Sequence, residues 1–142
     1  ECNSTFWLYA HRFNLELNGF DDLNFIWMNV NKFGRNTGKG KPEQVVLDDE
    51  VHYYNLLAEE LEILQPDVCL FFTGPNYDED IRLKISDIEY HEFAGYSVRN
   101  VAKLCSKHLP KLSYRTYHPG YGNRISETYQ DILNAILKDC KR

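Results

Sequence analysis

The sequence has no apolar run that could cross a membrane. Its apolar runs, of which Val68–Phe72 is typical, have the length of a strand, whereas a membrane-spanning helix needs about 20 apolar residues. A secretory signal, which joins a positively charged start to an apolar stretch and a small-residue cleavage site, is also missing. We therefore expect a soluble, cytoplasmic protein without a membrane partner.

The cysteines are few, and their spacing fits no metal motif. The four cysteines, Cys2, Cys69, Cys105 and Cys140, include no C-x-x-C pair, so a zinc site is not expected. Cys69 lies in the most apolar segment, which is typical of a small buried hydrophobe. We predict reduced thiols in an intracellular protein, with no metal and no cofactor.

Positive charge is also in short supply. Lys and Arg number 16 against 21 Asp and Glu, which gives a net charge of -5. This balance argues against binding of nucleic acid through an extended positively charged surface. A local basic strip nevertheless stands out in a Gly-rich stretch, and it consists of Lys32, Arg35, Lys39 and Lys41.

The remaining composition is that of one globular domain. Hydrophobic residues make up 43% and charged residues 26% of 142 residues, which is an ordinary balance and an ordinary length for a single folded unit. Aromatic residues reach 14%, and aromatic surface in excess of a core often lines a site. We predict one domain over residues 1–142.

Periodicity predicts helices at both ends and in the middle of the chain. Apolar residues recur at helical spacing over residues 4–17, 50–64 and 125–137, and a short helix is expected over Tyr77–Lys84. Ser4 is a favourable N-cap for the first helix, and Asn18-Gly19 is a favourable stop.

Between these helices, apolar segments predict strands at Phe25–Val30, Asp67–Thr73, Ile85–Phe93 and Ser113–Tyr117. The continuous apolar run of the second implies burial on both faces, and Val98–Cys105 fits either a strand or a helix. Alternation of helices and strands predicts an α/β fold, with three α/β/α layers and a mostly parallel central sheet.

Three predicted strand ends carry polar chemistry. Asn29, Gly74 and His118 each follow an apolar strand, and ligands of open α/β sheets bind beyond the carboxyl ends of strands. We therefore expect these residues to line one cleft. The Asn29 amide suits the edge of a base, and a loop-capping role is an equal alternative. His118 can donate to an oxygen that gains charge, or act as acid or base, with loop packing as the competing role.

Nearby charged and aromatic residues allow two interpretations each. Asp78 is either a catalytic carboxylate or a first-turn residue that favours a helix. Arg115 and Arg124 either contact phosphate or form surface ion pairs. Three tyrosines, which either stack on a base or pack in the core, are Tyr77, Tyr117 and Tyr121.

In these motifs the sequence resembles the uracil-DNA glycosylase superfamily, over residues 20–140. Phe25–Asn29 occupies the place of the family's apolar strand that ends in a base-reading Asn. Pro66–Gly74 matches the later apolar strand that ends in Gly. Arg115–Pro119 fits the strand that leads into a His-Pro-Ser loop, although Gly120 stands where Ser is usual.

The resemblance implies a three-layer glycosylase fold and hydrolysis of the N-glycosidic bond of uracil or a related base. The DNA would contain a deaminated or damaged base, which must be flipped out to be reached. His118 would stabilise the departing anionic base, and Asn29 would select uracil by its edge. Other implied base contacts are Phe13, Gly74 and Tyr121, with Trp7 or Tyr9 as other sources of an aromatic face. The implied DNA contacts are Lys32, Arg35, Arg115 and Arg124.

One family motif is missing, and its absence keeps other functions open. The Gly-rich loop that positions the attacking water would precede Glu1, so we expect a domain truncated at its N-terminus. A non-catalytic member of the same fold, which binds a nucleotide, nucleic acid or protein, is the second hypothesis. A third is an unrelated hydrolytic enzyme that uses His118 with Asp78, and the lack of a G-x-S-x-G elbow argues against acyl transfer.

Overall fold

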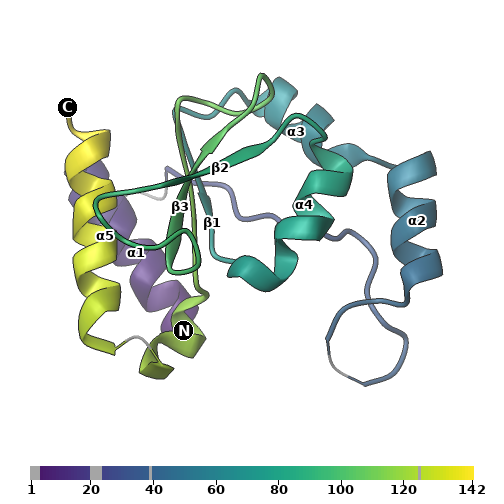
Figure 1. Cartoon of the computed structure of the whole chain (residues 1–142), viewed down its shortest axis with the longest axis horizontal. Helices are drawn as coiled ribbons and strands as arrows, with labels where there is room; N and C mark the ends of the chain where they lie inside the picture. The colour runs from purple at the N-terminus through teal and green to yellow at the C-terminus, as the bar shows by residue number, and fades with distance from the viewer. Residues whose placement is uncertain (1–3, 20–23, 39, 125) are drawn as a thin grey trace.

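The computed structural model shows a mixed α/β fold around a four-stranded sheet (Figure 1). It describes residues 4–19, 24–38, 40–124 and 126–142, without the side chains of 122–124, 126 and 127. The helices are α1 (Thr5–Asn18), α2 (Gln44–Tyr53), α3 (Leu56–Leu64), α4 (Asp78–Lys84) and α5 (Ser126–Cys140). The strands are β1 (Val68–Phe71), β2 (Glu89–Glu92), β3 (Val101–Cys105) and β4 (Leu112–Thr116). Two short 3-10 helices are η1 (Pro75–Tyr77) and η2 (Pro119–Arg124).

The sheet is mostly antiparallel, so the predicted parallel sheet is wrong. Its order is β1-β4-β3-β2, and only β1 and β4 run parallel. The reason is that β2, β3 and β4 follow one another through short connections, whereas a parallel pair needs a long crossover. Between β2 and β3, Ala94 and Gly95 have φ of 53° and 80°, as in a tight two-residue turn. This turn joins Phe93 to Tyr96, which form an isolated bridge.

The predicted strand Phe25–Val30 does not form, and the predicted long helix over 50–64 is divided. The described segment 24–30 joins no sheet, and its apolar side chains Met28 and Val30 pack against a core cluster. The helix breaks between α2 and α3, where the Asn55 side-chain amide donates to the Lys84 carbonyl at 2.9 Å. The helix is thus interrupted at the point where a side chain makes a hydrogen bond to the backbone of α4.

The helix at the start of the described chain confirms the capping prediction. Ser4 Oγ accepts from the Trp7 backbone N–H at 3.4 Å. At the other end Gly19 has φ of 76°, and its N–H donates to the Leu15 carbonyl at 2.8 Å. Caps of this kind satisfy backbone groups that a helix end leaves unpaired, so local sequence alone sets both limits of α1.

The hydrophobic core forms two clusters on opposite faces of the sheet. Neighbouring residues of β3 point to opposite sides, and accordingly Val101 belongs to one cluster and Ala102 to the other. In Figure 1, α1 and α5 lie together on one side of the sheet, and α3 and α4 lie on the other. The α3–α4 cluster contains Leu57, Leu61, Phe71, Ile81, Ile85, Ile88, Ala102 and Leu104. The α5 cluster contains Val101, Tyr114, Tyr129, Ile132, Leu133 and Ile136.

Two further findings concern membrane passage and thiols. No helix in the described ranges combines the length and the apolarity that a bilayer crossing requires. Cys69, Cys105 and Cys140 are free thiols, and Cys2 lies outside the described residues. Cys69 lies in β1 against the α3–α4 cluster, and burial raises the pKa of its thiol to about 12. At neutral pH that thiol is therefore protonated, and the thiolate is the form that acts as a nucleophile.

Candidate functional site

The loops that follow β1 and β4 pack directly against each other. These strands are parallel neighbours, so their carboxyl ends share one edge of the sheet. The Gly74 N–H donates to the Thr116 carbonyl at 3.0 Å. Gly74 has φ of +67°, and a Cβ there would lie 3.2 Å from Cδ1 of Tyr117. A glycine is therefore required at this crossing for both its conformation and its size.

His118 presents a neutral imidazole with one free donor. Its Nδ1 accepts from the Gly120 backbone N–H at 3.0 Å, which places the proton of the neutral ring on Nε2. No acceptor for Nε2–H is present among the described residues. The ring is half-buried, and burial lowers its pKa from the usual 6.5. At neutral pH the side chain is consequently an uncharged hydrogen-bond donor.

Gly120 allows this arrangement because it has no side chain. A Cβ at Gly120 would lie 3.1 Å from His118 Nδ1, which is tighter than ordinary van der Waals contact. The loop continues into η2, where the Tyr121 N–H donates to the His118 carbonyl at 2.8 Å.

Aromatic rings surround the His118 ring. Phe6, from the first turn of α1, stacks on it with centroids 5.4 Å apart and planes 15° apart. Tyr121 meets it edge-on at 6.1 Å. Phe6 in turn contacts Phe72 at 5.9 Å and Trp27 at 6.1 Å. Beyond them, Thr73 Oγ1 is buried without a hydrogen-bond partner in the described part of the chain.

The structure brings together only some of the predicted base contacts. Gly74, His118 and Tyr121 meet at this edge, whereas Phe13 packs against the α5 cluster. The aromatic face predicted for Phe13 is therefore corrected to Phe6, two helical turns earlier on α1. Of the other two sources, Trp7 contacts Phe6 at 5.2 Å, and Tyr9 contacts Tyr129 of α5 at 5.3 Å.

Asn29 has a different setting from the predicted one. It is exposed and lies in the segment that joins no sheet, so its predicted place at a strand end is wrong. Among the described residues, no hydrogen bond or ion pair joins Asn29 to Gly74 or His118. The Gly74 and His118 loops meet at one edge of the sheet, whereas the place of Asn29 in the same cleft stays a prediction.

Two lysines of the predicted basic strip are paired with neighbouring acids. Lys32 Nζ lies 2.5 Å from Glu60 Oε2, and Lys41 Nζ lies 2.7 Å from Asp80 Oδ1. Arg35 is exposed. Lys39 lies outside the described residues, as does the side chain of Arg124 at the end of η2. Two of the four positive charges of the strip are thus already paired with carboxylates.

Arg115 cannot make the predicted contact with DNA, because its side chain is 0% exposed. Its guanidinium donates to both carboxylate oxygens of Asp78, at 2.9 and 2.8 Å, and to the Arg99 carbonyl at 3.1 Å. Burial raises the pKa of Asp78, while the paired guanidinium opposes that rise. Asp78 therefore joins β4 to the start of α4. Because its carboxylate is bound by Arg115, it is not available to act with His118, as the third hypothesis required.

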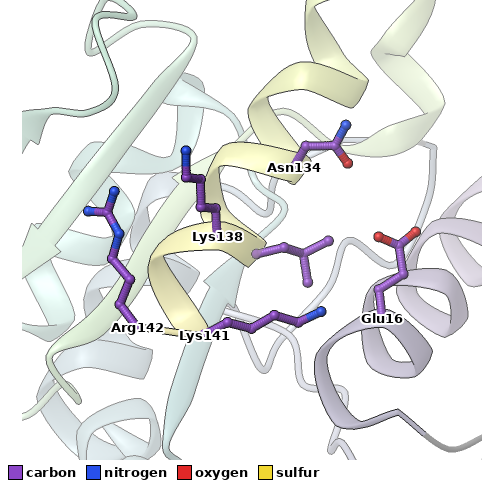
Figure 2. A pocket seen from close by; sticks show the side chains of 6 residues that line it. Glu16, Asn134, Lys138, Lys141 and Arg142 are labelled. Atoms are coloured by element: carbon purple, nitrogen blue, oxygen red, sulfur yellow. The ribbon is translucent and has the colours of Figure 1, made fainter.

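Two hollows of the described surface lie between α1 and α5, away from His118. The larger, of about 490 Å³, lies between α1 and α5. Figure 2 shows its polar side chains, which come from α1 and from the C-terminal end of the chain: Glu16, Asn134, Lys138, Lys141 and Arg142. The described residues also contain no group of three His, Cys, Asp or Glu that could hold a metal ion. The His118 ring is half-buried and lined by aromatic rings.

Comparisons with known proteins add no relative. The chain matches no protein-family model, no curated protein and no solved structure. The site must therefore be interpreted from its own geometry.

Proposed function

We propose that this chain is a DNA glycosylase-like protein that hydrolyses the N-glycosidic bond of uracil or a related base, with a three-layer fold of the uracil-DNA glycosylase type. The observation that carries the proposal is the free Nε2–H of a neutral, half-buried His118, placed beside aromatic rings. A base offers the carbonyl acceptor and the flat face that such a site would hold.

His118 would act on charge that develops as the bond breaks. In this reaction the oxygen of water bonds to the sugar carbon, the base leaves as an anion with the electron pair of the broken bond, and the proton that the water loses passes to solvent, from which the base anion is protonated. A fixed N–H donor stabilises the departing anion more than the bound base, so it lowers the barrier. The Gly120 N–H keeps the imidazole in the tautomer that this role requires.

A second candidate function is base binding without cleavage. It is favoured by the absence, within the described ranges, of a carboxylate that shifts the pKa of His118, since burial alone lowers that pKa. Asp78, the carboxylate that sequence had singled out, is held by Arg115. The same Nε2–H would then read a base carbonyl in a stable complex.

Single-turnover release of base from uracil-, thymine- and cytosine-containing single strands tests both candidates. We expect His118→Ala to lower the release of uracil by about 100- to 1000-fold, as for the loss of one oxyanion donor. The control is His91→Ala, because His91 is exposed on β2 at the far edge of the sheet.

The outcomes separate the two candidates. Absence of release by the wild type, together with uracil-dependent binding that His118→Ala removes, would establish base binding without cleavage. Absence of release together with binding that is equal in wild type and His118→Ala would overturn both.

A further inference from the structure

We propose that a continuous row of four rings, Trp27, Phe6, His118 and Tyr121, is a stacking platform for single-stranded DNA. These residues are called the ring row below. The inference rests on the proposed function, because it assigns the strands around the base that His118 would hold. It goes beyond that function by naming the substrate as single-stranded and by assigning two residues outside the base contact.

The row is formed by contacts between parts of the chain that are far apart in sequence. Trp27 contacts Phe6 at 6.1 Å, Phe6 stacks on His118 at 5.4 Å, and His118 contacts Tyr121 at 6.1 Å. Phe6 comes from α1, Tyr121 from η2 after β4, and Trp27 from the unpaired segment 24–30. The fold therefore gathers one ring from each of these segments around His118.

The two ends of the row are exposed to solvent. Trp27 is 54% exposed and Tyr121 is 60% exposed, although both are large side chains that a core would normally bury. Grouped aromatic exposure of this kind marks a binding surface more often than chance. The exposed rings lie at the two ends of the row that contains His118, so a ligand of His118 would also meet them.

The orientation of the rings favours a single strand over a duplex. The plane of Trp27 is tilted 59° from that of Phe6, and the plane of Tyr121 is tilted 76° from that of His118. A base stacked on Tyr121 therefore cannot lie parallel to a base stacked on His118, whereas successive bases of a duplex are stacked nearly parallel. Aromatic stacking also tolerates any base, because every base has a flat face.

The charge distribution indicates that stacking, rather than phosphate contact, would supply the affinity. The chain has a net charge of -5, and Lys32 and Lys41 are already paired with carboxylates. The slope of binding against salt scales with the number of phosphates that a protein neutralises. We accordingly expect a shallow salt dependence for this protein.

The experiment is a fluorescence-anisotropy titration of labelled 12-nucleotide strands, with and without one central uracil, and of the matching duplex. We expect Trp27→Ala and Tyr121→Ala each to weaken binding of both single strands roughly 5- to 150-fold, the range for one stacked base. Trp27→Phe, which keeps a ring, should retain most of the affinity. Tyr53→Ala is the matched control, because Tyr53 is 67% exposed on α2, at the opposite end of the molecule from η2 (Figure 1).

The outcomes distinguish failure of the ring row from failure of the proposed function. If Trp27→Ala binds as tightly as Tyr53→Ala, the row is overturned, even where His118→Ala weakens binding of the uracil strand alone. If Trp27→Ala weakens both single strands while His118→Ala shows no preference for uracil, the row stands and the proposed function fails. Equal affinity for the duplex, or a dimer that Trp27→Ala dissociates in sedimentation, would also overturn the row.

Discussion

Two regions of this molecule treat buried polar groups in opposite ways. Between α2 and α4, Lys84 and Glu50 form an ion pair in which each side chain is at most 2% exposed. Lys84 Nζ also donates to the Val30 carbonyl at 2.6 Å and to Asn31 Oδ1 at 2.9 Å. At the His118 site, by contrast, the described residues provide no charge near the ring and no acceptor for Nε2–H.

The α2–α4 region, here called the ionic clamp, holds the segment that failed to become a strand. Glu50 accepts from the backbone N–H groups of Lys32 and Phe33, at 2.9 and 3.2 Å. Burial alone would raise the pKa of Glu50, but the hydrogen bonds from Lys84 and these two N–H groups together lower it. Asn31 extends the clamp to Asp80 at 2.8 Å. The backbone of this segment is thus held by hydrogen bonds to polar side chains, and not by hydrogen bonds to a neighbouring strand.

The comparison separates groups that hold the fold from a group that is left for a ligand. Buried charges in the clamp have several partners each, which is what stability requires of them. A half-buried donor without a partner, as at His118, contributes little to stability and is free to meet a ligand. Mutations in the two regions should accordingly separate stability from binding.

The largest effect is expected for Lys84→Met, which breaks the clamp. It leaves Glu50 buried without its cation, and such losses cost about 3–5 kcal/mol of the free energy of unfolding. Arg82→Met is the control on the same helix, because the Arg82–Glu79 pair is 48% and 78% exposed, and an exposed pair contributes about 0–1 kcal/mol. Urea unfolding measures both.

A double variant sharpens this result. Lys84→Met combined with Glu50→Leu removes both charges and should recover much of the lost stability, since a buried pair can often be replaced by apolar groups. Equal unfolding free energies for Lys84→Met and Arg82→Met would contradict the structural role of the clamp.

A smaller effect is expected at the crossing of the two site loops, for Gly74→Ala. The φ of +67° and the approach of 3.2 Å to Tyr117 should cost roughly 1–3 kcal/mol in unfolding free energy. Gly95→Ala is the matched control, because Gly95 has φ of +80° with nothing within 4 Å of the added Cβ. The difference between the unfolding free energies lost in Gly74→Ala and in Gly95→Ala therefore measures the contact with Tyr117. Equal losses would show that the two loops are not closely packed at Gly74.

The sequence predicted those parts of the fold that depend on local chemistry. Ser4 and Gly19 set the ends of α1, and the apolar run before Gly74 contains β1. It failed where distant residues decide the outcome. The Phe25–Val30 segment is apolar enough for a strand, but Glu50 and Lys84 hold its end, and no local pattern reveals that.

The site was predictable only in part, for the same reason. Gly74, His118 and Tyr121 each follow a strand, so their order along the chain indicated a shared edge. Phe6 had no such signal, because it looks like any apolar residue of an amphipathic helix until the fold places it on His118. The turn at Ala94-Gly95 did carry a signal for an antiparallel return, since Gly after a small residue can supply positive φ.

The smallest expected effect is a pH dependence that distinguishes the two regions. Both His118 and Glu50 have pKa values lowered in the folded state, from the usual 6.5 and 4.5 respectively. In each case the unfolded chain takes up the proton first as the pH falls, so folding stability decreases. The contribution of His118 is fully present above about pH 6.5 and is lost as the pH falls through its folded pKa. That of Glu50 is fully present above about pH 4.5 and is lost only in more acidic solution.

Urea unfolding between about pH 8 and pH 5 therefore reports on the site and not on the clamp. Wild type should lose stability across this range, and His118→Gln, which cannot take up a proton, should show a smaller loss. Protonation of Nδ1 also removes the acceptor for the Gly120 N–H, so the loop that carries Tyr121 should loosen over the same range. If wild type and His118→Gln gave parallel curves, burial would not be lowering the pKa of His118, and its role as a neutral donor at pH 7 would lose its physical basis.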